Sequence, residues 1–177
     1  MDLFSNEAVE VGSLPRAEET TLLPIEPLYW KVLQWSWMIT WVLVVLLATT
    51  IILIVSPRDL LLWVSTLPPL LLAAFLTHWL LRKSNSRKAY AVRDKDIIYR
   101  SGWLIRRISI CPFNRIQHCS INSGPFERKL GLASLSVHTA GTEGADIKIP
   151  GLKEETAFAL RDFIMSKTHT VYEQAGN

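Results

Sequence analysis

The sequence predicts a pair of transmembrane helices followed by a small cytoplasmic domain of mixed α and β structure. Of the 177 residues, 49% are hydrophobic and only 20% are charged. Two long uncharged stretches lie between residues 32 and 81, and after residue 89 short apolar runs alternate with turn-forming residues. The length excludes a multidomain enzyme or a large transporter, and two cysteines exclude a disulfide scaffold.

Charge is unevenly distributed along the chain. Before Leu33, two basic and six acidic residues give a net charge of −4, and the segment from Leu33 to Leu81 is neutral. From Arg82 to the end, sixteen basic and nine acidic residues give +7. Residues 1–27 also contain three prolines, so we expect a disordered acidic tail there.

The two uncharged stretches have the length of membrane spans. We expect spans at residues 33–55 and 60–81 within a helical hairpin covering 28–81, because about 21 helical residues reach roughly 31 Å. A secretory signal peptide is the first alternative, but this apolar region begins too late and is too long. A buried hairpin of a soluble protein is the second, but little polar sequence would remain to cover it.

A basic juxtamembrane linker, residues 82–88, follows the second span. It contains Arg82, Lys83, Arg87 and Lys88, whereas the turn between the spans carries Arg58 as its single basic residue. The positive-inside rule therefore places the linker and the following domain in the cytoplasm. Two spans return the N-terminus to the same side, so we expect a multi-pass protein with both termini cytoplasmic.

Aromatic, proline and histidine residues in the spans have separate interpretations. Tryptophans near the span ends predict an interfacial aromatic belt. Pro68–Pro69 predicts a kink, with the hydroxyls of Ser65 and Thr66 as the nearest partners for the freed carbonyls. His78 is the ionisable group inside the second span, and it motivates a minor hypothesis, a subunit of a small-solute or proton pathway.

Residues 89–167 are predicted to form an antiparallel β domain with a C-terminal helix, followed by a tail at 168–177. Candidate strands are 90–93, 97–101, 104–111, 116–123, 132–139 and 146–149. In the fifth strand, alternation places Leu135 and its i±2 neighbours inward, and Ser134, Ser136 and His138 toward water. The helix is expected to pack through its Leu160 face, with Phe158 pointing away.

Several ordered motifs in this domain are similar to those of one bacterial family. They are Asn-Arg-Ile-Gln at 114–117, the segment from Gly124 to Leu132, Val-His-Thr-Ala-Gly at 137–141 and Ile-Pro-Gly-Leu at 149–152. With the order of elements from about residue 29 to 167, they resemble the YdbS-like (bPH2-type) bacterial pleckstrin-homology membrane proteins. The resemblance implies an inner-membrane protein with a pleckstrin-homology-like antiparallel β barrel and a C-terminal helix. Some members are encoded beside a larger protein with repeated copies of the domain, which implies a larger paralogous partner.

No motif predicts catalysis, a cofactor or a metal. Cys111, His118 and Cys119 lack the spacing of a zinc site, and the chain contains neither a nucleophile elbow nor a phosphate-binding loop. No aromatic platform alternates with the basic residues, so nucleic acid is not an expected partner. The sequence therefore predicts a non-enzymatic protein.

The remaining candidates are surface residues for lipid or partner contact. We select Arg82, Lys83, Arg87, Lys88, Arg106, Arg107, Arg115, Arg128, Lys129 and Phe158. The first hypothesis is that the cytoplasmic domain binds a protein partner, either a larger relative or a second copy, and assembles a membrane complex. The alternative is that the basic residues sense anionic lipid at the inner leaflet, in addition to setting topology.

Overall fold

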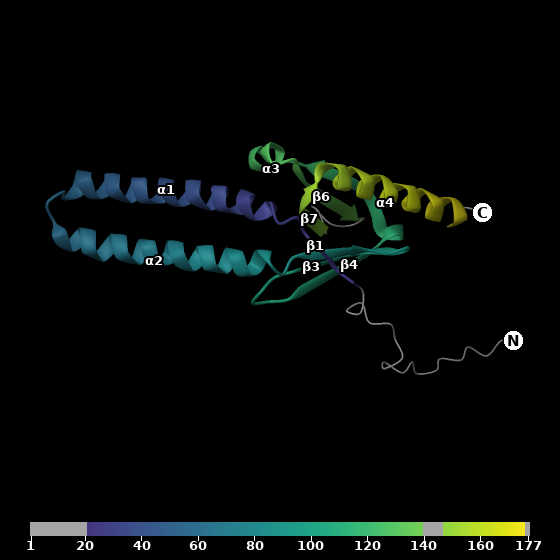
Figure 1. The fold of residues 1–177 in the computed structure, drawn as a ribbon, viewed down its shortest axis with the longest axis horizontal. Helices are drawn as coiled ribbons and strands as arrows, with labels where there is room; N and C mark the ends of the chain where they lie inside the picture. The colour runs from purple at the N-terminus through teal and green to yellow at the C-terminus, as the bar shows by residue number, and fades with distance from the viewer. Residues whose placement is uncertain (1–20, 140–146, 176–177) are drawn as a thin grey trace, which may run out of the picture.

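The computed structural model describes residues 21–139 and 147–175, with side chains described as far as Thr168. Most of the predicted acidic tail, the first residue of the strand predicted at 146–149 and the end of the predicted C-terminal tail lie outside the described residues. Two long antiparallel helices extend from one side of a small domain, which gives the molecule an elongated shape (Figure 1).

Both predicted spans are helices. α1 comprises Tyr29–Val55 and α2 comprises Leu60–Asn85, so each extends beyond the predicted span at the end that meets the domain. The Asp59 carboxylate begins α2 by accepting a hydrogen bond from the Leu61 N–H at 3.0 Å. Both helices are long and apolar enough to cross a membrane, and their apolar stretches are almost entirely exposed, unlike those of a core helix.

Helix α2 continues through Pro68–Pro69. Each proline leaves a carbonyl four residues earlier, that of Val64 or Ser65, without its usual N–H donor. The hydroxyls of Ser65 and Thr66 do not reach those carbonyls, because both donate to the Leu62 carbonyl, at 3.2 and 2.6 Å. These hydroxyls therefore reinforce the turn that precedes the prolines.

The helical pair is inserted between two neighbouring strands. β1 (Leu23–Pro24) pairs antiparallel with β2 (Ala89–Val92), with Leu23 opposite Tyr90. Ile25, which follows β1, is buried in the domain core. The predicted disordered tail therefore ends before Leu23, because Leu23 and Pro24 pair with β2 and Ile25 is buried in the core. Both ends of the helical pair are fixed to one sheet.

The domain contains two antiparallel sheets. The first has the order β1, β2, β3 (Asp96–Ser101) and β4 (Arg107–Pro112), and the second has β5 (Ile116–Asn122), β6 (Leu132–Thr139) and β7 (Ile147–Lys153). A short 3-10 helix, η3 (Phe113–Arg115), joins them. Among the described residues no ladder connects the two sheets, so they do not form the closed barrel that the family resemblance implies.

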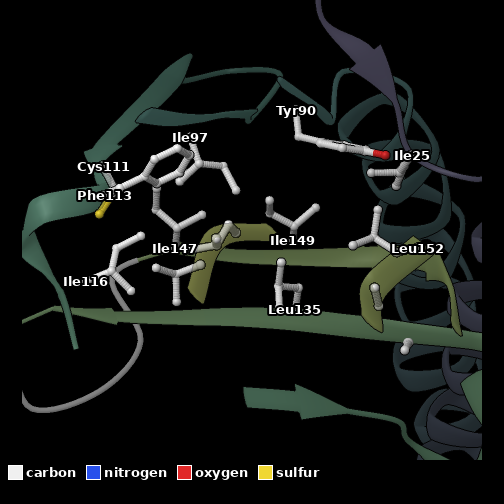
Figure 2. Close-up of a cluster of buried hydrophobic side chains, with 14 residues drawn as sticks. Ile25, Tyr90, Ile97, Cys111, Phe113, Ile116, Leu135, Ile147, Ile149 and Leu152 are labelled. Atoms are coloured by element: carbon white, nitrogen blue, oxygen red, sulfur yellow. The ribbon is translucent and has the colours of Figure 1, made fainter. Parts of the chain in front are cut away.

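The core lies between the two sheets. Large side chains from both meet there, including Ile97, Phe113, Ile116, Leu135 and Ile149, all at most 2% exposed (Figure 2). Burying each such side chain contributes about 1.5–3 kcal/mol. This core holds the two sheets, and with them the ends of α1 and α2, in one arrangement.

Strand β6 departs from the predicted alternation. Leu135 is fully buried as expected, but Ser134 and Ser136 are also buried, at 2% and 4% exposure. The Ser134 hydroxyl donates to the Glu127 carboxylate at 2.8 Å. Glu127 belongs to α3 (Pro125–Lys129), a short helix that the strand pattern does not predict. The outward face of β6 is therefore partly covered.

The C-terminal helix, α4, comprises Glu154–Ala175 and so continues past the predicted end at residue 167. Ala157 and Ile164 are fully buried and Leu160 packs against the core, so the buried face passes through Leu160 as predicted. Phe158 is 40% exposed and lies on another side of the helix.

Candidate functional site

The turn between β3 and β4, residues 102–106, lies against the end of α2. We call these residues the hairpin tip. The tip begins at Gly102, whose φ is +87° and whose replacement Cβ would overlap the Ile105 carbonyl oxygen. The Trp103 ring meets the Trp79 ring of α2 edge to face, with centroids 5.3 Å apart. The tip therefore extends from the domain toward the helical pair (Figure 1).

Two apolar side chains at the tip have few protein contacts. Leu104 is 84% exposed and Ile105 is 77% exposed. They were predicted to begin a strand at 104–111, but β4 begins at Arg107 because the tight turn at Gly102 occupies the preceding residues. Adjacent exposed side chains of this size make the tip a candidate surface for contact with lipid or with another molecule.

Beside the tip lies a basic cleft of about 320 Å³, lined by Arg87, Arg100, Gly102, Trp103 and Arg106. We call it the arginine cleft. Its cationic residues come from three segments: the linker after α2, strand β3 and the hairpin tip. The structure thus brings together Arg87 and Arg106, which the sequence selected, and Arg100, which it did not.

The short helix α3 makes a second contact with the helical pair. Phe126 meets Trp35 of α1 edge to face at a centroid distance of 5.8 Å, and Lys129 Nζ lies 5.5 Å from the same ring. Glu127 holds the helix in place, because its carboxylate accepts hydrogen bonds from the Gly124 N–H at 2.9 Å and from Ser134. Arg128, on the same short helix, is exposed.

The linker also contributes to the junction between helices and domain. Lys83 Nζ lies 5.9 Å from the Trp79 ring centroid, and Lys88 Nζ lies 5.1 Å from that of Tyr29. Burial lowers the pKa of Lys88, because desolvation disfavours its charged form. Gly151, with φ +66°, packs so closely on Tyr29 that an added Cβ would clash with the ring.

Other predicted contact residues lie around or away from this junction. Arg82 is exposed on the last turn of α2, and Arg107 is exposed at the start of β4. Arg115 is exposed on η3, at the opposite end of β4 from the hairpin tip and thus about 20 Å away along the strand. Phe158 lies beside the Arg161 guanidinium at 5.0 Å and lines a separate groove.

The remaining reactive side chains of the described residues are the cysteines and a pair of histidines. Among the described residues no three His, Cys, Asp or Glu side chains are placed to hold a metal ion. Burial raises the pKa of Cys119 to about 11, with a smaller contribution from Cys111, so the thiolate that nucleophilic chemistry needs is disfavoured. His118 and His138 stack at 4.3 Å on the sheet surface.

His78 lies at the domain-side end of α2. Its ring meets those of Trp30 and Trp37 edge to face, at 5.3 and 4.9 Å. The Nδ1 atom is buried and has no hydrogen-bond partner among the residues that the structure describes. Trp37 and the neighbouring Thr77 form a hydrogen bond, 3.1 Å long, that joins α1 to α2. His78 is thus part of an aromatic contact between the two helices.

Comparison with known proteins places these features in a family. The family model of the bacterial PH domain matches residues 21–168. The chain belongs to this bacterial PH domain family. The match includes β1 and both long helices as well as the sheets, so the family definition covers the inserted helical pair.

A relative supports membrane localisation of this bacterial PH domain protein. The UPF0699 transmembrane protein YdbS of Bacillus subtilis (strain 168) is 36% identical over 75 residues. The aligned segment covers 42% of this chain and 45% of that protein, so the chain aligns with less than half of its relative. No solved structure matches the chain. The protein is a YdbS-like transmembrane protein with a bacterial PH domain.

Sequence reasoning missed Arg100, Trp103, Leu104 and Ile105. The available signal was the segment Gly-Trp-Leu-Ile-Arg-Arg at 102–107, in which three apolar residues follow a glycine and precede two arginines. Read as the start of a strand, the segment would direct Trp103, Leu104 and Ile105 alternately to opposite faces of the sheet. Read as a turn, it exposes them together.

Proposed function

We propose that this protein is non-enzymatic and holds its PH domain on the cytoplasmic face of the bacterial inner membrane, where the domain binds anionic lipid. In this arrangement α1 and α2 both span the bilayer and both termini are cytoplasmic. Arg82, Lys83, Arg87 and Lys88 at the domain-side end of α2 support this orientation through the positive-inside rule.

The observation that carries the lipid proposal is the position of two projections beside the helix ends. The hairpin tip contacts α2 through Trp103, and α3 contacts α1 through Phe126. Both projections carry basic side chains next to aromatic ones, which is the composition of a surface that meets lipid headgroups. Each basic residue near an anionic leaflet contributes about 1 kcal/mol.

Lipid selectivity of the full chain tests this proposal. The full chain is required because β1 precedes the helices, so a fragment from residue 89 would lack one strand. Spin-labelled phosphatidylglycerol and phosphatidylcholine are compared in the same reconstituted membranes, and we expect preferential retention of phosphatidylglycerol that weakens as salt is raised. Equal retention of the two lipids would contradict the proposal.

Assembly with another protein is a second candidate, and a separate groove favours it. This groove, about 540 Å³, lies between the start of α1 and α4, where Leu28, Leu130 and Phe158 combine with Lys153, Glu154 and Glu155. Mixed charges around apolar side chains suit a protein segment better than an anionic membrane. The partner would be a larger PH-domain relative or a second copy of this chain. Cross-linking in native membranes tests this candidate, and a chain that remains monomeric and without a partner would contradict it.

A further inference from the structure

We propose that the arginine cleft binds one phosphate group, supplied by the headgroup of an anionic phospholipid. The inference rests on the proposed function for the orientation of the domain toward the bilayer. It adds a discrete site, formed by Arg87, Arg100 and Arg106, to the general electrostatic attraction of the basic surface.

Charge is the first argument. The three arginines line one cleft of about 320 Å³, and no ion pair among the described residues involves Arg87 or Arg100. Guanidinium groups that share a cleft repel one another, and a bound anion removes that repulsion. The planar guanidinium group of arginine can donate two parallel N–H hydrogen bonds to the oxygens of one phosphate.

The backbone positions Arg100 for this role. Ile97 and Tyr99 of β3 pack on the core, so Arg100 lies on the other face of the strand. Its cross-strand neighbours are Ala89 on β2 and Ile108 on β4, of which Ala89 has the smaller side chain. Gly102 then turns the chain tightly enough to bring Arg106 back to the same cleft.

The hairpin tip indicates that the phosphate belongs to a lipid. Leu104 and Ile105 are almost fully exposed and directly precede Arg106. Trp103 packs against Trp79 of α2. Tryptophan is enriched at the membrane–water interface, so this contact indicates the depth of the tip. With the apolar side chains among the acyl chains, the cleft lies at the depth of the phosphates. A soluble phosphate compound bound in the cleft would leave the side chains of Leu104 and Ile105 exposed to water.

Hydrogen exchange on the full chain in nanodiscs tests the site. Three conditions are compared: phosphatidylcholine alone, an equal mixture with phosphatidylglycerol, and phosphatidylcholine with free inorganic phosphate. Phosphatidylcholine carries the same phosphate beside a fixed positive charge, which the arginines repel. We expect phosphatidylglycerol to slow exchange at residues 100–106, and free phosphate to leave it unchanged.

Variants with equal charge changes separate the cleft from the surrounding surface. Arg100→Gln or Arg87→Gln should raise the phosphatidylglycerol fraction needed for half-maximal protection by about fivefold. Arg115→Gln, distant on η3, is the control with the same charge change and should alter it less than about twofold. Arg87 and Arg115 are exposed and Arg100 is half-buried, with none of them in the core, so the fold should be retained.

The outcomes distinguish the cleft from the proposed function. The protein could still prefer phosphatidylglycerol while Arg100→Gln leaves the protection of the tip unchanged. That result would overturn the cleft as the phosphate site and leave the proposed function intact. Protection by free phosphate equal to that by phosphatidylglycerol would assign the cleft to a soluble phosphate compound and overturn the lipid source. Absence of phosphatidylglycerol preference in the wild type, with the free-phosphate effect present, would overturn the proposed function and the lipid source together.

Discussion

The hairpin tip and α3 project toward the same end of the molecule, and each places an aromatic ring edge to face on a tryptophan of one long helix. Trp103 contacts Trp79 of α2, and Phe126 contacts Trp35 of α1. In α3 two further side chains are also engaged: Lys129 lies over Trp35, and Glu127 accepts hydrogen bonds from Gly124 and Ser134. In the hairpin tip, Leu104 and Ile105 remain exposed.

This difference in exposure distinguishes side chains that attach a projection to the long helices from side chains that are available to bind another molecule. Side chains that are engaged inside the protein fix a projection in place, as Phe126, Glu127 and Lys129 of α3 do. Exposed apolar side chains beside a basic cleft stabilise nothing in the isolated molecule, so their contribution depends on a contact outside it. Under the lipid proposal, similar composition in the two projections serves two purposes, and substitutions in matched positions should separate them.

The largest expected difference concerns the glycine of each projection. Gly102 at the tip and Gly131 after α3 both have positive φ, +87° and +64°. A Cβ at Gly131 meets nothing within 4 Å, so Gly131→Ala should cost roughly 1–2 kcal/mol for its left-handed backbone. Gly102→Ala adds a clash with the Ile105 carbonyl and should exceed that cost. Thermal unfolding in detergent micelles measures both.

Hydrogen exchange supplies the control for the glycine pair. Gly102→Ala should increase exchange through the hairpin tip, because the turn must rearrange, while Gly131→Ala should leave the tip unaffected. Equal destabilisation by the two substitutions would show that the close approach of the Ile105 carbonyl does not constrain the turn.

A smaller effect is expected from the two aromatic contacts. Trp103→Ala and Phe126→Ala each remove an edge-to-face pair, which contributes about 0.5–1.5 kcal/mol beyond the area it buries. Each loss should be local: exchange should rise in the hairpin tip for Trp103→Ala and in α3 for Phe126→Ala. If either substitution loosened both projections equally, the two contacts with the helical pair would not be independent.

Much of the fold follows from sequence periodicity because apolar patterning determines what is buried. The two uncharged stretches and the strand centred on Leu135 were predicted on this basis, and the structure has them. Strand β1 could not be predicted, because its two residues are too few to show alternation and its partner β2 lies beyond both helices. Ser134 was expected to face water, but α3 covers it through Glu127.

The candidate site was predicted in part for a related reason. Clustered basic residues are visible from charge alone, which selected Arg87 beside the second span and Arg106 in an arginine pair of the domain. Their convergence with Arg100 depends on how three segments meet, and neither charge nor spacing contains that information. Leu104 was assigned to a strand because apolar residues next to a strand extend its pattern, whereas the turn at Gly102 excludes it.

The smallest effect on stability should come from the exposed pair at the tip. Leu104→Ser with Ile105→Ser removes two large apolar side chains that are 84% and 77% exposed, so the unfolding free energy in micelles should change by less than about 0.5 kcal/mol. The matched substitution Phe126→Ser in α3 should cost more, because that ring packs on Trp35. A loss above about 1 kcal/mol for the tip pair would show that these side chains support the fold. In that event the contrast between the two projections would disappear, because both would be attachments.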